Sequence, residues 1–289
     1  MQKKNIKIEE DLQQIANMLL LNGTLTQCPG LVHGKMGIAI FFFHYALFTG
    51  NELFADYAMD VIGEMLDQIH VNSPADYERG IAGIGVGIDN LIFNDFLSVE
   101  DDICEGFDQR MFRAVMYDPY SDFTLYGGLI GYGQYWITRL RYQESTILAR
   151  KCLSHITVLI SERFSDISIT EQTDVFCFLC DLQKISGFDD CFRLLDLCQR
   201  KWNLQSLSIV KRFSRLGDSM IGNFIRAYQC NRYFNDVLQD EFDIALRQIP
   251  NLDIGKAPTN AGILNGYSGE GMLRMLALGQ ANISWMHLL

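Results

Sequence analysis

Two kinds of apolar segment alternate along the chain. In the first kind, as at residues 38–47 and 221–228, apolar side chains cover most of the helical circumference, which suits a helix packed on nearly all sides. The second kind is more amphipathic; in its first example, 51–70, apolar residues recur at every third or fourth position and acidic residues occupy the other face. Segments of this amphipathic kind are 51–70, 99–116, 143–164, 190–202 and 231–249. Because the alternation typical of strands is never sustained, the pattern predicts an all-α protein with inner and outer helices.

A glycine motif precedes most of the apolar segments. Its pattern is Gly-x-x-Gly, and its first glycines are Gly34, Gly80, Gly128 and Gly266. Gly217 opens a degenerate copy with Met220 in place of the second glycine, and the phase predicts a copy without glycines near position 172. Since the copies recur at roughly 47 residues, the sequence predicts six helical-hairpin repeats.

Six inner helices need six outer helices, yet the chain ends soon after the last inner helix. The amphipathic segment 9–21 supplies the missing outer helix if it packs near residues 267–280. We therefore predict an (α/α)6 toroid of residues 1–289 in one domain, closed by this N-terminal helix. At each inner-helix start, glycine would permit close backbone approach and an unusual φ, and the first amides would point into a common basin.

Composition supports a packed fold and restricts the partners. Hydrophobic residues make up 48% of the chain and charged residues 20%, and the net charge of −11 disfavours a nucleic-acid partner. The first ten residues lack the apolar core of a signal peptide, and the apolar stretch 38–48 is too short for a membrane span. We expect a cytoplasmic protein. The eight cysteines are scattered through helical segments, a pattern typical of free, mostly buried thiols.

Polar residues beside the motif glycines are the candidate ligand contacts, because convergent polar groups in a concavity mark a ligand site. The predicted basin is lined by His33, Arg79, Tyr126, Arg215, Asp218, Asn265 and Tyr267. The catalytic residues stay unknown from the sequence, and the candidates are His33, Glu78, Asp174 and Asp218. The alternative is that these groups are solvated at the rim, or bond to the loops and only brace the ring.

The first motif and its flanks resemble one family. Residues 28–37 are Cys-Pro-Gly-Leu-Val-His-Gly-Lys-Met-Gly, followed by an apolar run at 38–46 and Thr-Gly-Asn-Glu at 49–52. With the phase of the other glycine motifs, this is similar to lanthionine synthetase C-like (LanC-like) proteins over about residues 28 to 280. The resemblance implies cyclases that add a peptide Cys thiol to a dehydrated Ser or Thr while a ribosomally made peptide matures. Similar toroids occur among glycosidases and prenyl-group enzymes, so the fold alone leaves the function open.

The zinc ligands that the resemblance implies are not matched. In the family they are the Cys of a Trp-Cys-Tyr-Gly motif and the Cys-His pair of a Cys-His-Gly motif. Here Arg215 takes the first position, and Leu264 and Asn265 take the other two. If the last repeat matches the family's final, metal-free repeat instead, the Cys-His-Gly repeat is absent. The family's Ala-His-Gly motif falls near 173–175 and is also unmatched. We therefore expect no zinc cofactor. Weak candidates for relocated ligands are Cys28, His33, Cys177 and Cys180.

Three functions follow from these observations. The first, which we favour, is a zinc-less LanC-like protein that binds a precursor peptide or acts beside a peptide-modifying enzyme. Arg79 and Arg215 would then hold an acidic leader peptide. The second is an active thioether cyclase with relocated ligands. The third is a carbohydrate-active toroid, which needs paired carboxylates such as Glu78, Asp174 or Asp218.

Overall fold

The computed structural model describes residues 2–98, 104–142, 147–189, 191–202, 260–264 and 266–289, with 224, 228–229, 232–233 and 249. The regular structure in these ranges is helical, apart from one isolated bridge between Asn260 and Gly266, so the predicted all-α class is confirmed. Within this described part, none of the helices is long and apolar enough to cross a bilayer. The chain divides into two compact units, Met1–Ser73 with Leu216–Leu289 and Pro74–Arg215.

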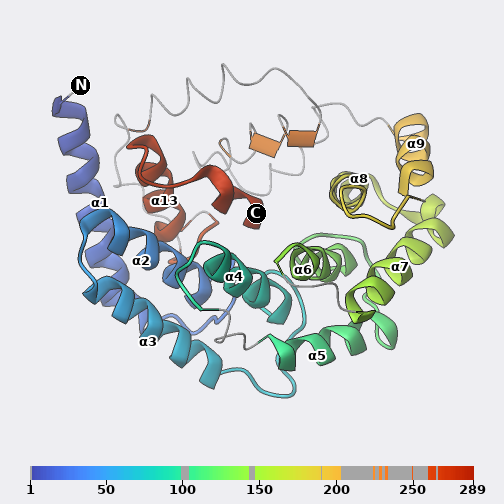
Figure 1. Cartoon of the computed structure of the whole chain (residues 1–289), viewed down its shortest axis with the longest axis horizontal. Helices are drawn as coiled ribbons and strands as arrows, with labels where there is room; N and C mark the ends of the chain where they lie inside the picture. The colour runs from blue at the N-terminus through green and yellow to red at the C-terminus, as the bar shows by residue number, and fades with distance from the viewer. Residues whose placement is uncertain are drawn as a thin grey trace. The chain divides into compact units, whose positions relative to one another are not determined.

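The first unit contains α1 (Gln2–Gly23), α2 (Lys35–Thr49), α3 (Leu53–Asp67), α13 (Tyr267–Ala277) and the 3-10 helix η5 (Ile283–Leu288). The helix α2 packs against both α3 and α13, and α13 also packs against α1 (Figure 1). The predicted position of the N-terminal helix beside the last repeat is therefore confirmed. Arg274 of α13 is almost fully buried, and its Nε lies 3.3 Å from Asp11 Oδ2 of α1.

The second unit contains α4 (Ile81–Phe93), α5 (Glu105–Met116), α6 (Leu129–Tyr142), α7 (Ile147–Glu162), η2 (Phe164–Asp166), α8 (Ile169–Leu182) and α9 (Cys191–Lys201). The helix α6 packs between α4 and α8, whereas α5, α7 and α9 run along one side of these three (Figure 1). Along the chain, the helices α4, α6 and α8 of one layer therefore alternate with α5, α7 and α9 of the other.

Burial separates the two predicted layers. Every residue of α2 from Lys35 to Ala46 is buried, and so is every residue of α4 from Ile81 to Leu91. On α3, by contrast, only Ala58, Val61, Ile62 and Met65 are buried. The inner and outer assignments made from hydrophobic periodicity are therefore confirmed for these helices.

Neighbouring inner helices fit together through one recurrent pair, a glycine on one helix against an aromatic ring on the next. A Cβ built on Gly85 would lie 3.1 Å from Tyr135 Cδ2, and one on Gly133 would lie 3.1 Å from Phe178 Cδ2. The pairs are Gly85–Tyr135, Gly133–Phe178 and Gly271–Phe41. Only a residue without a Cβ admits the ring at this distance. The last pair joins the last repeat to the first and follows the same rule.

Buried charges join the helices where the sequence pattern shows only an apolar run. The Arg139 guanidinium of α6 donates to Asp89 of α4 at 2.8 Å and to both carboxylate oxygens of Asp108 on α5 at 3.2 Å. Tyr135 donates to Asp108, and burial together with that carboxylate raises the pKa of Tyr135. Because each buried charge has an opposite charge beside it, the desolvation cost of the group is offset.

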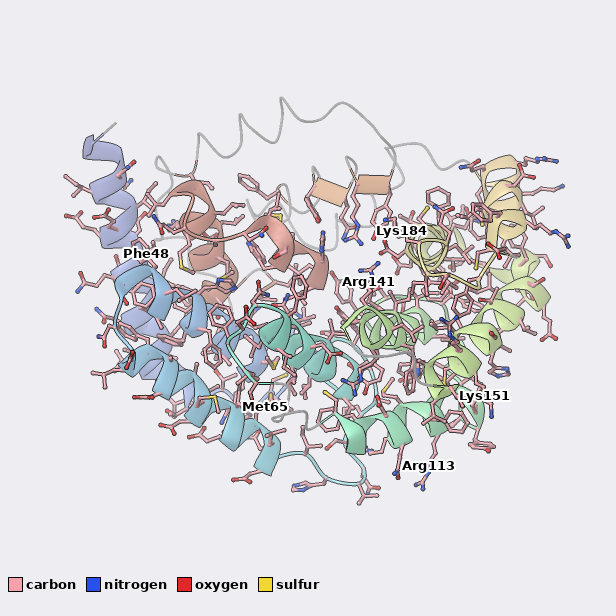
Figure 2. The ribbon with its side chains drawn as sticks, viewed as in Figure 1. Phe48, Met65, Arg113, Arg141, Lys151 and Lys184 are labelled. Atoms are coloured by element: carbon pink, nitrogen blue, oxygen red, sulfur yellow. The ribbon has the colours of Figure 1, made fainter. Side chains whose placement is uncertain are left out.

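A second ionic group lies where α6 and α8 end. The buried Asp181 carboxylate lies 3.4 Å from Arg141 Nη2 and 3.0 Å from Lys184 Nζ. Figure 2 labels Arg141, at the end of α6, and Lys184, just after α8. In the first unit, His44 on α2 is also buried, and burial lowers its pKa to about 4. His44 is therefore neutral at pH 7.

Candidate functional site

The loops before α2, α4, α6 and α13 share one backbone geometry. In each, the first helical amide donates to a carbonyl seven residues earlier: Lys35 to Cys28, Ile81 to Pro74, Leu129 to Asp122 and Tyr267 to Asn260, at 2.9 to 3.2 Å. The loop thus folds back over the start of its own helix. Its carbonyl satisfies an amide that would otherwise lack an intrahelical partner.

This geometry corrects two expectations about the motif glycines. The helix-start amides do not point into a common basin, because the loop carbonyls accept their hydrogen bonds. The φ values are also ordinary, since Gly34, Gly80 and Gly266 have extended backbone with φ of −133°, −105° and −121°. What the position needs is space, because a Cβ on Gly80 would lie 2.7 Å from the carbonyl carbon of Pro74.

Adjacent loops are joined by backbone hydrogen bonds, in which amides of one loop donate to a carbonyl of the loop in the next repeat. The amides of Tyr77 and Glu78 both donate to the carbonyl of Tyr126 in the next loop at 3.1 Å. In the first unit, the amide of Leu264 in the last repeat donates to the carbonyl of Val32 in the first at 3.1 Å. The motif loops within each unit therefore form a continuous face, and we call this the motif-loop face.

In the second unit, the motif-loop face contains Glu78, Arg79 and Tyr126. The Arg79 side chain is 66% exposed, and its Nε lies 3.5 Å from Glu78 Oε1. The Arg79 amide donates to Asp76 Oδ1 at 2.7 Å, which fixes the backbone of this loop. Because the ion pair is largely exposed, it stabilises the fold by less than about 1 kcal/mol, and Arg79 does not brace the unit.

Asp174 has a different place from the one predicted. It is buried near the start of α8, and its Oδ2 accepts the amide of Leu125 at 2.7 Å. Glu171 lies one turn earlier, and its Oε1 accepts the amide of Phe123 at 2.7 Å. Asp174 therefore holds the neighbouring loop, which disfavours both a catalytic role for it and its part in a glycosidase carboxylate pair.

Sequence reasoning missed Tyr132, which is buried on α6 behind the same loops. Burial raises the pKa of Tyr132, and the nearby Tyr120 and the carboxylates of Asp76, Asp118 and Asp122 raise it further. The Tyr120 and Tyr132 rings lie edge to face with centroids 6.2 Å apart. Tyr132 keeps its proton and can donate a hydrogen bond at neutral pH. Its signal in the sequence was its place inside the third glycine motif.

In the first unit, the motif-loop face contains Cys28, His33 and Tyr267, all partly exposed. The Cys28 carbonyl accepts the amide of Lys35, and the backbone of His33 lies against Gly262, at which a Cβ would meet the His33 carbonyl carbon at 2.7 Å. The buried Lys35 points away to α3, where its Nζ binds Glu64 at 2.5 Å. His33 and Tyr267 are thus brought to one pair of joined loops.

The remaining predicted residues are two cysteines on α8 and three residues that the structure does not describe. Cys177 is buried and Cys180 is partly exposed, and both lie on α8 in the second unit. Arg215, Asp218 and Asn265 lie outside the described residues. Over the described ranges, no group of three or more His, Cys, Asp or Glu side chains is arranged to hold a metal ion.

Comparison with known proteins adds no assignment. No protein-family model matches the chain, and a search of curated proteins found no match. The interpretation of the motif-loop face therefore depends on its geometry and on the sequence motifs.

Proposed function

We propose that this chain is a closed (α/α)6 toroid of the LanC-like type that binds a precursor peptide at its motif-loop face without zinc. Ring closure is supported by the joints between the last repeat and the first. Gly271 meets Phe41 by the same rule that pairs Gly85 with Tyr135, and Leu264 donates to Val32 much as Tyr77 donates to Tyr126. A chain of repeats whose last member contacts its first in the way that neighbouring repeats of the second unit contact each other is expected to close.

The observation that carries the peptide proposal is the recurrence of one loop geometry at four helix starts. Backbone groups of these loops hydrogen-bond to their own helix start or to a neighbouring loop. A ligand would therefore be contacted by side chains that project from the face. The exposed Arg79 is the clearest of these, because its guanidinium offers several donors in a fixed fork that matches a carboxylate.

The test uses synthetic peptides of equal length labelled with fluorescein, one rich in Asp and Glu, one rich in Lys and Arg, and one neutral. We expect fluorescence anisotropy to show binding of the acidic peptide, weakened at least tenfold by Arg79→Ala. The melting temperature should stay within a few degrees because the side chain is exposed. The matched control is Arg113→Ala on α5, whose side chain points away from the helices in Figure 2.

Equal weakening by Arg113→Ala, or no binding of the acidic peptide, would contradict the proposed role of Arg79. Preferential binding of the basic peptide would assign the face to a cationic segment, consistent with the carboxylates around Tyr132. The thioether-cyclase alternative is tested separately by elemental analysis. We expect well below one zinc per chain after dialysis. The measurement is decisive because a structural zinc ion, bound with roughly 10 to 16 kcal/mol, would stay bound during dialysis.

A further inference from the structure

The loop that carries Tyr126 is held by ionisable side chains at three alternate residues. Arg163 donates to the carbonyl of Ser121, and its guanidinium carbon lies 4.9 Å from the centre of the Phe123 ring. Glu171 accepts the Phe123 amide and Asp174 accepts the Leu125 amide, each at 2.7 Å. The segment 121–125 is thus held through its backbone by side chains from residues 163–174.

The spacing of these groups explains how the segment is held. Phe123 and Leu125 are alternate residues of this segment, and the amide of each donates to a carboxylate of α8. Residues 171 and 174 are three apart on α8 and share one helix face. Two carboxylates at this spacing therefore reach two alternate amides of the segment. Phe123 and Leu125 are themselves buried, so the joint is shielded from water.

Glu171 has a second task at the same place. Its Oε2 accepts the Ser168 amide at 2.8 Å, which forms a capping box at the start of α8. The fourth repeat has lost the glycine motif, and this capping box supplies the helix start that a folded-back loop supplies elsewhere. The position of the neighbouring loop therefore depends on side chains here, whereas the joints at Tyr126 and Val32 use backbone carbonyls.

The effect extends to the second repeat. Tyr126 directly follows the held segment, and its carbonyl accepts the amides of Tyr77 and Glu78. We infer that Glu171 and Asp174 are positioning residues of the motif-loop face: they fix segment 121–125 and, through the Tyr126 carbonyl, the loop that bears Glu78 and Arg79. This inference rests on the proposed function only where it treats the motif-loop face as the ligand-binding surface.

Amide hydrogen exchange in the full-length protein tests this, followed by NMR on deuterated samples. In Asp174→Ala we expect the Leu125 amide to exchange at least tenfold faster, and the Tyr77 and Glu78 amides to exchange measurably faster. Amides in the middle of α4 and α6 should keep their rates. Asp174→Asn, which retains an acceptor oxygen, should restore most of the protection. The paired variants Glu171→Ala and Glu171→Gln should act in the same way at Phe123.

The control is Asp196→Ala on α9, which removes an exposed ion pair with Arg200 and should leave all these amides unchanged. Two outcomes would overturn the inference. One is unchanged exchange at Leu125 and Glu78 in Asp174→Ala, and the other is uniform acceleration through α4 and α6, which would mean a general loss of stability. Because no peptide is added, failure here is distinct from failure of the peptide-binding proposal.

Discussion

Two adjacent glycines in one loop offer a sharp test of the argument that the motif glycines provide space. A Cβ on Gly128 would lie 2.6 Å from the amide nitrogen of Thr124 and 2.7 Å from the carbonyl oxygen of Asp122. A Cβ on Gly127 would meet only Thr124 Oγ1, at 3.8 Å, which is ordinary contact. Neither glycine has a positive φ, so steric space is the difference between the two positions.

The cost of Gly128→Ala can be worked from these contacts. Overpacking against backbone atoms, which cannot rotate away, costs about 1 to 3 kcal/mol. The shift also weakens the 3.0 Å hydrogen bond from Leu129 to Asp122, which contributes about 1 kcal/mol. Alanine also lowers the conformational entropy of the unfolded chain, which stabilises the folded state by about 0.4 to 1 kcal/mol. We expect a net loss of about 1 to 3.5 kcal/mol, a sizeable part of the about 5 to 15 kcal/mol typical of a folded protein.

Urea unfolding followed by far-ultraviolet circular dichroism measures both variants against the wild type. Gly127→Ala should lie within about 1 kcal/mol of the wild type, because it gains the same unfolded-state term without the clash. The dependence on urea should keep its slope, since the surface exposed on unfolding is unchanged. If Gly128→Ala proves as stable as Gly127→Ala, the glycines are not required for close backbone approach and the explanation of the repeated motif fails.

Three further predictions concern buried charge. His44 has its pKa lowered to about 4 by burial, so the unfolded chain, with a pKa near 6.5, takes up the proton first. Above about pH 6.5 His44 does not lower the free energy of unfolding, and this free energy falls as the pH is lowered further. Urea titrations should show that between pH 7 and 4.5 the wild type loses about 2 to 3 kcal/mol more of it than His44→Leu does. Arg139→Ala should cost about 3 to 5 kcal/mol because it strands two buried carboxylates, whereas Arg79→Ala should cost less than about 1 kcal/mol; similar melting temperatures for the two would refute the contrast. Arg274→Ala should cost about 3 to 5 kcal/mol, and a double-mutant cycle with Asp11→Ala should be strongly non-additive; additive losses would mean that the α1 to α13 ion pair contributes nothing.

Much of the fold follows from periodicity in the sequence. The apolar run after Gly34 predicted an inner helix at 38–47, and α2 spans Lys35–Thr49. The three-to-four spacing in 51–70 predicted an outer helix, and α3 spans Leu53–Asp67. Even the place of α1 followed from counting, because an inner helix with an exposed apolar face is unstable without a partner. These features depend on side-chain hydrophobicity at a fixed helical period, which the sequence states directly.

The chemistry of the loops depended on tertiary structure. Asp174 is an acidic residue at a helix start, and the sequence alone permits it to face solvent, a ligand or another loop. Only the fold brings the Leu125 amide within 2.7 Å of its carboxylate. The same holds for Arg139, whose partners Asp89 and Asp108 lie far from it in sequence. Hydrophobic pattern is a local property of the chain, whereas the partner of a polar group is set by which distant segments packing brings together.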